Sequence, residues 1–359
     1  MKNLVGVAEE LIAIRSTADR PGELGRALDL VLGFVGAGFT VERFESRGKP
    51  SALVYRGARR PHFRVIFNAH LDVVPGADEQ FQPRRAGDRL IGRGAHDMKV
   101  AALVLADVFR ETARELPYPI GLQLVTDEEV GGYDGTAHQL AAGVTGDFVV
   151  IGEQSDLRVV TESKGIAQVR LLAAGVAAHA AYPWLGANAL LVLTGAIDRI
   201  VRRYPVPAAE QWSTTVTVAR IETANQAVNQ VPAQACAWLD LRFPPEDRDF
   251  AGRGRDEVAA HLRSLAGGTV EVRVDNLGPP HFADPGCAEV VLLREVAGNG
   301  ELLRKHGAAD GRFYSERGVN AVIFGPGGAG QHGPDEYLDL STVEPYHDAL
   351  VSFLRRLMP

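Results

Sequence analysis

The stretch Arg64–Asp72 reads RVIFNAHLD, and its apolar run, Arg64–Phe67, is followed shortly by a histidine and an aspartate. A short apolar run bounded by polar residues is typical of a strand buried in a sheet. The same pattern recurs at Ile120–Val125, Phe148–Ile151 and Ala321–Phe324. Between the first two runs, Met98–Leu116 carries apolar residues at helical spacing. Strands that alternate with helices predict an α/β fold.

Acidic and histidine side chains follow each of these runs. His70 and Asp72 follow the first run, residues 127–129 (Asp-Glu-Glu) the second, Glu153 the third and His332 the fourth. In open α/β sheets, functional groups gather beyond the carboxyl ends of the strands. We therefore expect these side chains to converge in space.

Asp97, in GRGAHDMK just before a predicted helix, adds a further carboxylate. Converging carboxylates repel one another unless a cation is present. Two histidines with three or four carboxylates form a donor set that zinc accepts. Each motif alone has a simpler interpretation, such as a surface turn at HxD, a solvated acidic loop tip, a helix cap or a flexible turn around His332. Their joint placement after successive strands favours a metal site.

The residues from Gly165 to about Asn276 have a different pattern, which predicts a separate small domain. The predicted order is strand, helix, strand, strand, helix and strand, over Ile166–Leu172, Asn188–Arg203, Ser213–Ile221, Ala235–Phe243, Asp256–Leu265 and Glu271–Val274. A block of this length is sufficient for its own domain. It is predicted to be an insertion into a first domain that resumes after Pro279.

Helices are predicted near both ends of the chain. Apolar residues between Leu4 and Ile14 recur at helical spacing, which predicts an amphipathic first helix. Ser341 with Glu344 three residues later is a capping-box pattern, and it predicts a last helix that runs towards Leu357.

The composition excludes several classes of function. A hydrophobic fraction of 46% and a charged fraction of 23% are typical of a globular protein. The net charge of -7 argues against a nucleic-acid partner, and no apolar stretch has the length of a membrane span. Cys236 and Cys287 form no CxxC pattern, which favours free thiols in a reducing compartment. We therefore expect a cytoplasmic protein that acts on a small molecule.

Five stretches in chain order resemble the successive motifs of the M20 family of metallopeptidases and deacylases: NAHLDVVPG, GRGAHDMK, TDEEVGG, VIGEQSD and HGPDEYL. The resemblance covers essentially the whole chain. It implies a catalytic domain with a mixed, zinc-peptidase-like sheet, formed by residues 1–164 and 278–359. It also implies that residues 165–277 form the inserted α+β (βαββαβ) domain that serves as a lid or dimerisation domain, and hence a homodimer.

The resemblance implies a metal-binding role for five residues. His70 and Glu153 would bind one divalent ion, Glu129 and His332 would bind a second, and Asp97 would bridge the two. The ions are expected to be Zn²⁺, with Co²⁺ or Mn²⁺ as alternatives, because carboxylate-rich sites accept several metals.

Three further residues would assist the chemistry. Asp72 would orient the imidazole of His70, and Glu128 would be the general base towards a metal-activated water. His179, in AAHAAYPWLGANAL, would donate to the developing oxyanion, often from the neighbouring subunit in the family. From its alanine-rich surroundings alone, His179 could equally be an ordinary buried histidine.

Substrate contacts are expected from Tyr182, Asn229, Arg242 and Arg312 by the same resemblance. The planar fork of an arginine suits a carboxylate, although a surface ion pair of Arg312 with Glu316 or Asp310 is an equal alternative. One departure bears on the substrate. Desuccinylase-like members carry hydroxyl residues where this chain has alanines at positions 308 and 309, which weakens a desuccinylase assignment.

The predicted function is metal-dependent hydrolysis of the amide bond of a small N-acyl amino acid. A dipeptidase or carboxypeptidase of the same family is the alternative, and a non-catalytic dimeric binding protein is a third hypothesis. The presence of Glu128 beside the ligand set favours an enzyme, because a binding protein needs no general base. The glycine pattern of residues 325–330 matches a dinucleotide fingerprint, but no helix pattern follows it, so that interpretation is rejected.

Overall fold

The computed structural model describes residues 2–298 and 300–358, and the chain divides into two compact units. The first unit comprises the described residues up to Thr161, Phe282–Arg304 and those from Ala309 onwards. The second unit comprises Glu162–His281 and Lys305–Ala308. The second unit therefore interrupts the first unit in the sequence, and a short segment further along the chain also groups with it.

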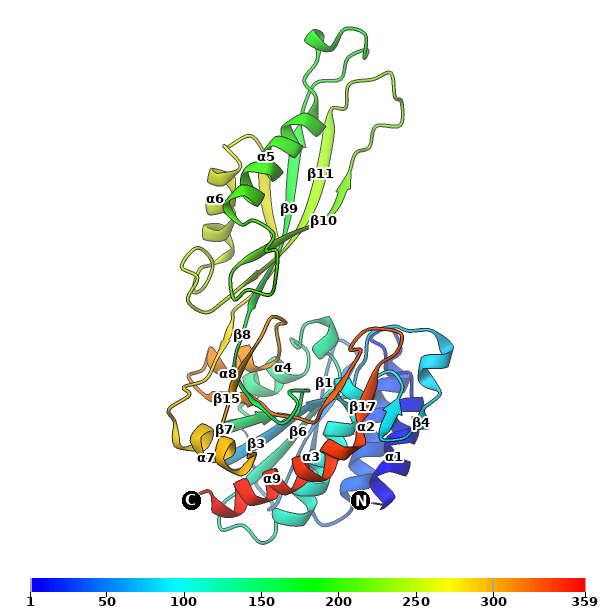
Figure 1. Ribbon diagram of the computed structural model, residues 1–359, viewed down its shortest axis with the longest axis vertical. Helices are drawn as coiled ribbons and strands as arrows, with labels where there is room; N and C mark the ends of the chain where they lie inside the picture. The colour runs from blue at the N-terminus through cyan, green and yellow to red at the C-terminus, as the bar shows by residue number, and fades with distance from the viewer. Residues whose placement is uncertain (1, 299, 359) are drawn as a thin grey trace. The chain divides into compact units, whose positions relative to one another are not determined.

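A mixed sheet of nine strands forms the centre of the first unit (Figure 1), which confirms the predicted α/β class with a mixed sheet. Its order is β1-β2-β6-β3-β7-β15-β8-β13, with β14 beside β8. Strands β6, β3, β7 and β15 are parallel neighbours, whereas β2 and β8 pair antiparallel with the two ends of this group. The strands are β1 (Thr40–Ser46), β2 (Lys49–Tyr55), β3 (Phe63–His70), β6 (Ile120–Val125), β7 (Gly146–Ile151), β8 (Val159–Ser163), β13 (His281–Phe282), β14 (Leu302–Lys305) and β15 (Asn320–Ile323).

Helices cover both faces of this sheet. On one face, Val65 and Phe67 of β3 share a core with residues of α1, α2, α3, α7 and α9. On the other face, Ile66 of β3 shares a core with Leu140 of α4 and Phe313 of α8. Strands covered on both faces read as continuous apolar runs, which is why these strands were visible in the sequence. The helices are α1 (Lys2–Ala13), α2 (Pro21–Val35), α3 (Val100–Thr112), α4 (Thr136–Ala141), α7 (Ala288–Val296), α8 (Gly311–Ser315) and α9 (Val343–Arg356).

The predicted last helix exists, but its predicted cap is wrong. Thr342 is the N-cap residue of α9, and its side chain makes no capping hydrogen bond. Ser341 instead donates its hydroxyl to Asp339 Oδ1 over 2.6 Å, and the same oxygen caps a short 3-10 turn that precedes α9. The Ser341 hydroxyl that a capping box would need is therefore already hydrogen-bonded within this turn. Among the described residues, no helix is both long and apolar enough to span a membrane.

A second, small antiparallel sheet carries the loop that contains His332. Its order is β16-β17-β5-β4, and its strands are β16 (Gly328–Ala329), β17 (Tyr337–Asp339), β5 (Arg89–Ile91) and β4 (Arg84–Ala86). The loop joins β16 to β17, so the antiparallel pairing of these two strands fixes both of its ends.

The second unit has the predicted order of elements. Its antiparallel sheet has the order β10-β11-β9-β12, and buried residues of α5 and α6 share a core with alternate residues of β9 and β11. Asn188 is the N-cap of α5 and accepts a hydrogen bond from the backbone N–H of Leu190 over 2.9 Å. The elements are β9 (Gly165–Ala174), α5 (Ala189–Arg203), β10 (Thr215–Glu222), β11 (Gln234–Phe243), α6 (Arg255–Leu265) and β12 (Glu271–Gly278).

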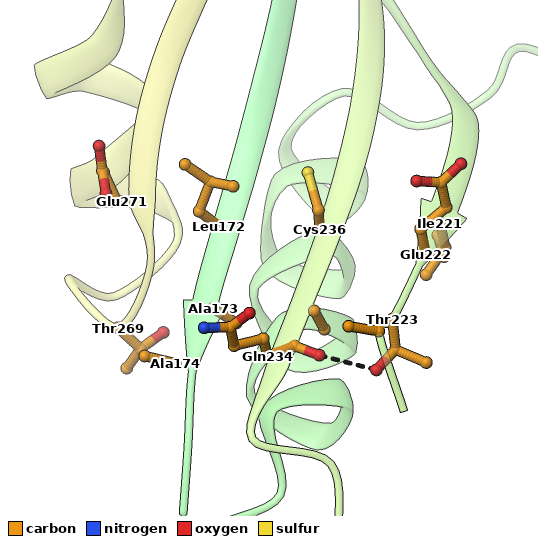
Figure 2. A pocket seen from close by; sticks show the side chains of 12 residues that line it. Leu172, Ala173, Ala174, Ile221, Glu222, Thr223, Gln234, Cys236, Thr269 and Glu271 are labelled. Atoms are coloured by element: carbon orange, nitrogen blue, oxygen red, sulfur yellow. Dashed lines mark hydrogen bonds between the residues drawn. The ribbon is translucent and has the colours of Figure 1, made fainter. Parts of the chain in front are cut away.

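The face of this sheet away from α5 and α6 is hollowed (Figure 2). The hollow has a volume of about 930 Å³, and its lining includes Leu172, Cys236 and Glu271. Of the residues that line it, two are carboxylates and one is a thiol, and none is a histidine. This hollow therefore contains none of the predicted site residues.

Candidate metal centre

Three neighbouring parallel strands bring the candidate ligands to one edge of the large sheet. His70 is the last residue of β3 and lies opposite Val125, the last residue of β6. Asn68 of β3 lies opposite Ile151, the last residue of β7. Glu128 and Glu129 follow β6 in a short 3-10 turn, and Glu153 follows β7. Parallel strands end at the same edge, so their following residues meet there.

The structure brings all five predicted ligands and Glu128 close together. His70, Glu128 and Glu153 each offer a ligand atom within 4.8 Å of the others, and so do His70, Asp97 and Glu129. His70 Nε2 lies 3.0 Å from Asp97 Oδ1. His332 Nε2 lies 3.3 Å from Asp97 Oδ2 and 3.1 Å from Glu129 Oε2. The two oxygens of Asp97 therefore face the two histidines.

The electrostatics of this cluster show an excess of negative charge. Burial, and then the charge of Glu153, raise the pKa of Glu128 well above its ordinary value. Burial also raises the pKa of Glu129. Hydrogen bonds to Asp97 and Glu129 raise the pKa of His332 to about 10. Raised pKa values of carboxylates and of a neighbouring histidine are expected where several negative charges are gathered in one place.

The pKa of His70 is also raised, and neighbouring carboxylates are again the cause. Burial alone would lower the pKa of its imidazole, but hydrogen bonds to Asp72 and Asp97 outweigh burial and raise it well above the ordinary value. Two imidazole nitrogens and several carboxylate oxygens around one another form a donor set that suits Zn²⁺. The residues present therefore fit a metal centre.

Asp72 contacts both His70 and the turn that carries Glu128 and Glu129. Its Oδ1 lies 3.6 Å from His70 Nδ1, and its backbone carbonyl lies 3.1 Å from the same nitrogen. Its carboxylate also accepts hydrogen bonds from the backbone N–H groups of Glu128 and Glu129, over 3.2 and 3.0 Å. The sequence analysis predicted the first contact and missed the second, because backbone partners leave no pattern in a sequence.

Glu336 is a structural residue of the site that the sequence analysis did not identify. Its Oε1 accepts hydrogen bonds from the backbone N–H groups of Gly94, His96 and Asp97, over 2.9, 3.1 and 3.1 Å. Its Oε2 lies 2.6 Å from Nη1 of Arg93. The only sequence signal was its place in HGPDEYL, four residues after His332.

Arg93 extends this contact to the His332 loop. Its Nη2 donates to the backbone carbonyls of His332 and Gly333, over 3.1 and 3.2 Å. Gln331 donates its side-chain amide to Asp97 Oδ2 over 2.5 Å. The segment that carries Asp97 and the loop that carries His332 are therefore held to each other by side chains outside the predicted ligand set.

Arg312 is buried, with 5% of its surface exposed. Its Nη2 donates to the backbone carbonyl of Gly131 over 2.7 Å, and its Nη1 donates to that of Ala309 over 3.1 Å. The predicted alternative, a surface ion pair of Arg312 with Glu316 or Asp310, is therefore not what the structure shows, although the positive charge of Arg312 opposes the rise in the pKa of the buried Asp310. Arg312 instead supports the loop that follows Glu129.

Asp310 supports the same loop from a second direction. Its Oδ2 accepts a hydrogen bond from Thr136 Oγ1 over 2.5 Å, and Thr136 accepts one from Asn68 Nδ2 over 3.0 Å. Gly132 has a φ of +67°, and a Cβ there would lie 2.1 Å from Asp310 Oδ1. This close approach requires glycine, and it holds the loop after Glu129 against α8.

The remaining predicted residues lie in the second unit. His179 is exposed, its Nδ1 accepts from the backbone N–H of Ala181 over 3.1 Å, and its ring lies 5.7 Å from that of Tyr182. The backbone carbonyl of Asn229 accepts from Ala180 N–H over 2.8 Å. Arg242 lies near the other end of β11, in an ion pair with Asp240. The structure thus groups His179, Tyr182 and Asn229 and leaves Arg242 apart from them.

The chain is similar to proteins of one known family. A model of Peptidase family M20/M25/M40 matches residues 66–356. Succinyl-diaminopimelate desuccinylase of Paracidovorax citrulli is 28% identical over 99% of this chain and 98% of its own length. The enzyme of the same name from Cereibacter sphaeroides (strain KD131) is 30% identical over 90% of this chain and 91% of its own length.

Solved structures show the same fold. A tripeptidase from Staphylococcus aureus has a TM-score of 0.78 at 18% identity, over 99% of this chain and 97% of its own. An M20 family metallo-carboxypeptidase from Sulfolobus solfataricus has a TM-score of 0.77 at 16% identity, over 99% of both chains. At these identities the likeness concerns the fold.

Proposed function

The chain belongs to the M20/M25/M40 family of peptidases, and we propose that it is a metal-dependent amidohydrolase that cleaves the amide bond of a small N-acyl amino acid. The observation that carries this proposal is the position of Glu128. This half-buried carboxylate has its ligand atom within 4.8 Å of those of His70 and Glu153, and its neighbour Glu129 contacts His332. A general base directly beside a metal-binding cluster is the arrangement that metal-assisted amide hydrolysis uses.

Two metal ions, proposed as Zn²⁺ with Co²⁺ or Mn²⁺ as alternatives, would be held by five residues. His70 and Glu153 would hold one ion, Glu129 and His332 the other, and Asp97 would lie between them. The opposed contacts of the two Asp97 oxygens with His70 and His332 support this division. When bound, such ions lower the pKa of a coordinated water and polarise a carbonyl group.

Glu128 would move the proton. Its carboxylate takes a proton from the attacking water and passes it to the nitrogen of the departing amine. Burial raises the pKa of Glu128, and this suits a group that must hold a proton between the two steps. The hydrogen bond from the backbone N–H of Glu128 to Asp72 holds the turn that carries it. Asp72 would thereby position both His70 and Glu128.

The second unit would complete the active site in a homodimer. Trp184, in the short 3-10 turn Pro183–Leu185, and Leu191, near the start of α5, are 73% and 71% exposed, and Leu185 and Val176 are exposed as well. Contiguous patches of exposed apolar side chains mark interaction surfaces. We infer that this surface pairs with a second copy and that His179, with Tyr182 and Asn229, contacts the substrate. Arg242 remains a predicted contact of the substrate carboxylate.

A dipeptidase or carboxypeptidase is the second candidate. The named structures of similar fold include a tripeptidase and a carboxypeptidase. The alanines at positions 308 and 309 and the backbone contacts of Arg312 favour an acyl group other than succinyl, because they leave few donors for a second carboxylate.

A cytoplasmic location is supported by the two cysteines, neither of which forms a disulfide in the described part of the chain.

Release of primary amine tests this proposal. The zinc-loaded protein is offered N-acetyl, N-propionyl and N-succinyl amino acids and a set of dipeptides, with a chelator-treated sample as control. We expect chelator-sensitive release from one of these classes. Glu128→Gln should lower kcat by roughly 10²–10⁴-fold while the zinc content stays unchanged. Undiminished turnover in this variant would contradict the assigned role of Glu128, and zinc-loaded protein without activity towards any class would favour the non-catalytic alternative.

A further inference from the structure

A cavity of about 320 Å³ opens beside Glu129 in the first unit. Its walls come from four parts of the chain: residues between Arg15 and Arg20 after α1, Val73–Gly76 after His70, Phe81 of the short helix Asp78–Phe81, and Glu129 with Val130. Small-molecule pockets have volumes of roughly 300–1,000 Å³, so the cavity has room for part of a substrate. Its position next to Glu129 places whatever it binds beside the metal-binding cluster.

The walls of this cavity are mainly apolar. Val73 and Phe81 are buried, and Val74, Pro75 and Val130 also line the cavity. Apolar groups of a ligand gain free energy from leaving water in such surroundings. A charged group would lose its hydration there and would need a partner that carries the opposite charge.

The charged side chains at the cavity balance one another, and Arg15 is held in an ion pair. Arg15 Nη1 lies 2.6 Å from Asp78 Oδ1, and its guanidinium group lies 4.9 Å from the centre of the Phe81 ring. Arg20 interacts electrostatically with both Asp19 and Asp78. Two arginines are thus balanced by two aspartates. The cavity therefore has no excess of positive charge for an anionic ligand.

Hydrogen bonds hold the walls in place. The backbone N–H of Val73 donates to Ser16 O over 3.0 Å, and Ser16 Oγ donates to Leu71 O over 2.6 Å. Gln80 donates its side-chain amide to Gly333 O over 2.8 Å, which joins the short helix to the His332 loop. The cavity is therefore formed before a ligand arrives, and this reduces the cost of binding.

We propose that this cavity is the subsite for an uncharged apolar group of the substrate, aliphatic or aromatic, that adjoins the scissile amide. The inference rests on the proposed function, because it takes Glu129 to be part of the metal centre. It narrows the substrate class to neutral N-acyl amino acids or peptides with an apolar side chain. Succinyl derivatives are disfavoured, because their carboxylate would be desolvated among apolar walls that carry no excess of positive charge.

Two substrate series and one binding series test this inference on the zinc-loaded protein. In the first series the acyl group of one amino acid lengthens from acetyl to hexanoyl. In the second the acyl group is acetyl and the amino-acid side chain lengthens from alanine to norleucine. We expect kcat/KM to rise by up to about fourfold per methylene in one of the two series. Calorimetry with n-alkyl carboxylates from acetate to octanoate measures binding without turnover.

Ala18 offers a variant that fills the cavity, because it lines the wall and is partly exposed. Ala18→Phe should flatten the dependence on chain length in both hydrolysis and binding. Val74→Thr, which keeps the shape and adds a hydroxyl, should weaken the dependence with less risk to folding. Ala58→Phe, at an exposed position outside the cavity, is the matched control and should keep the wild-type dependence.

The outcomes separate this inference from the proposed function. A rise with chain length that Ala18→Phe removes supports the subsite, and the series in which it occurs assigns the cavity to the acyl or the amine side. Hydrolysis that shows no dependence on chain length, or that is fastest with succinyl, overturns the subsite and leaves the hydrolase intact. If hydrolysis is absent but alkyl carboxylates bind more tightly as they lengthen, the subsite stands and the proposed function fails. Binding that is independent of length, without hydrolysis, overturns both.

Discussion

Replacement of Glu336 by glutamine tests whether the buried contact with Arg93 organises the metal centre. Glu336 is 1% exposed, and one carboxylate oxygen accepts from three backbone N–H groups, including that of Asp97. The other oxygen lies 2.6 Å from Arg93 Nη1. Glutamine has the same shape but only one acceptor oxygen. If that oxygen meets the backbone N–H groups, the side-chain amide faces Arg93, and two donors then oppose each other.

The expected loss follows from the burial of both partners. The side chains of Arg93 and Glu336 are 4% and 1% exposed, so water does not replace the lost contact. Removal of one partner from a buried ion pair costs about 3–5 kcal/mol. We expect Glu336→Gln to lower the free energy of unfolding of the metal-free protein by about 3 kcal/mol. Loss of a group that orients metal ligands typically weakens metal binding by about 10–100-fold.

Urea denaturation of the metal-free protein measures the first effect, and zinc competition with a chromophoric chelator measures the second. Asp335→Asn is the matched control, because Asp335 is the adjacent acidic residue and is exposed. This control should change the free energy of unfolding by no more than about 0.5 kcal/mol. If Glu336→Gln behaved like the control in both assays, Glu336 would not hold Asp97 and His332 together, and our reasoning would be refuted.

Three further predictions concern other parts of the molecule. His332→Ala should lose about half of the bound zinc in elemental analysis, whereas His62→Ala, at an exposed histidine that pairs with Asp147, should keep all of it. Burial raises the pKa of Asp310 to about 6 from the ordinary 3.8, so its stabilising contribution is present below pH 4 and is lost as pH rises through 6. The stability of wild-type metal-free protein relative to Asp310→Asn should therefore fall by up to about 3 kcal/mol between pH 4 and 7 in urea titrations, and a constant difference would contradict the cause assigned to the shift. Leu191→Glu should convert the proposed homodimer to a monomer in light scattering, whereas Arg202→Glu, an exposed position on the same helix, should leave the mass unchanged.

The strands of the large sheet that follow one another in parallel were predictable because burial on both faces leaves a continuous apolar run. Ile120–Val125 has the same bounds in the sequence analysis and in β6, and the predicted bounds of β3, β7 and β15 differ from the observed ones by at most three residues. Strand β1 was not predicted. Its side chains alternate between partly buried and exposed, so the segment carries no apolar run.

The second unit was predictable for a related reason. Its sheet is covered by helices on one face only, so β9 and β11 alternate between buried and less buried residues. This alternation, followed by helical spacing in α5 and α6, indicated the order of the elements. The sequence could not show which of its polar residues lie together. Arg242 lies towards one end of β11 and Asn229 precedes the other end, a separation that follows from the length of the strand.

The sequence by itself determined which donor side chains follow the parallel strands, because a strand that ends at His70 or Val125 delivers the next residues to the same edge. Only the tertiary structure decided which neighbouring polar groups support those donors. Asp335 and Glu336 are adjacent and both acidic, yet only Glu336 is buried against residues more than 230 positions earlier in the chain. Arg312 likewise donates a hydrogen bond to the backbone carbonyl of Gly131, which lies 181 positions away in the chain. Such contacts depend on how distant segments pack, and a buried charge takes whichever partner that packing supplies.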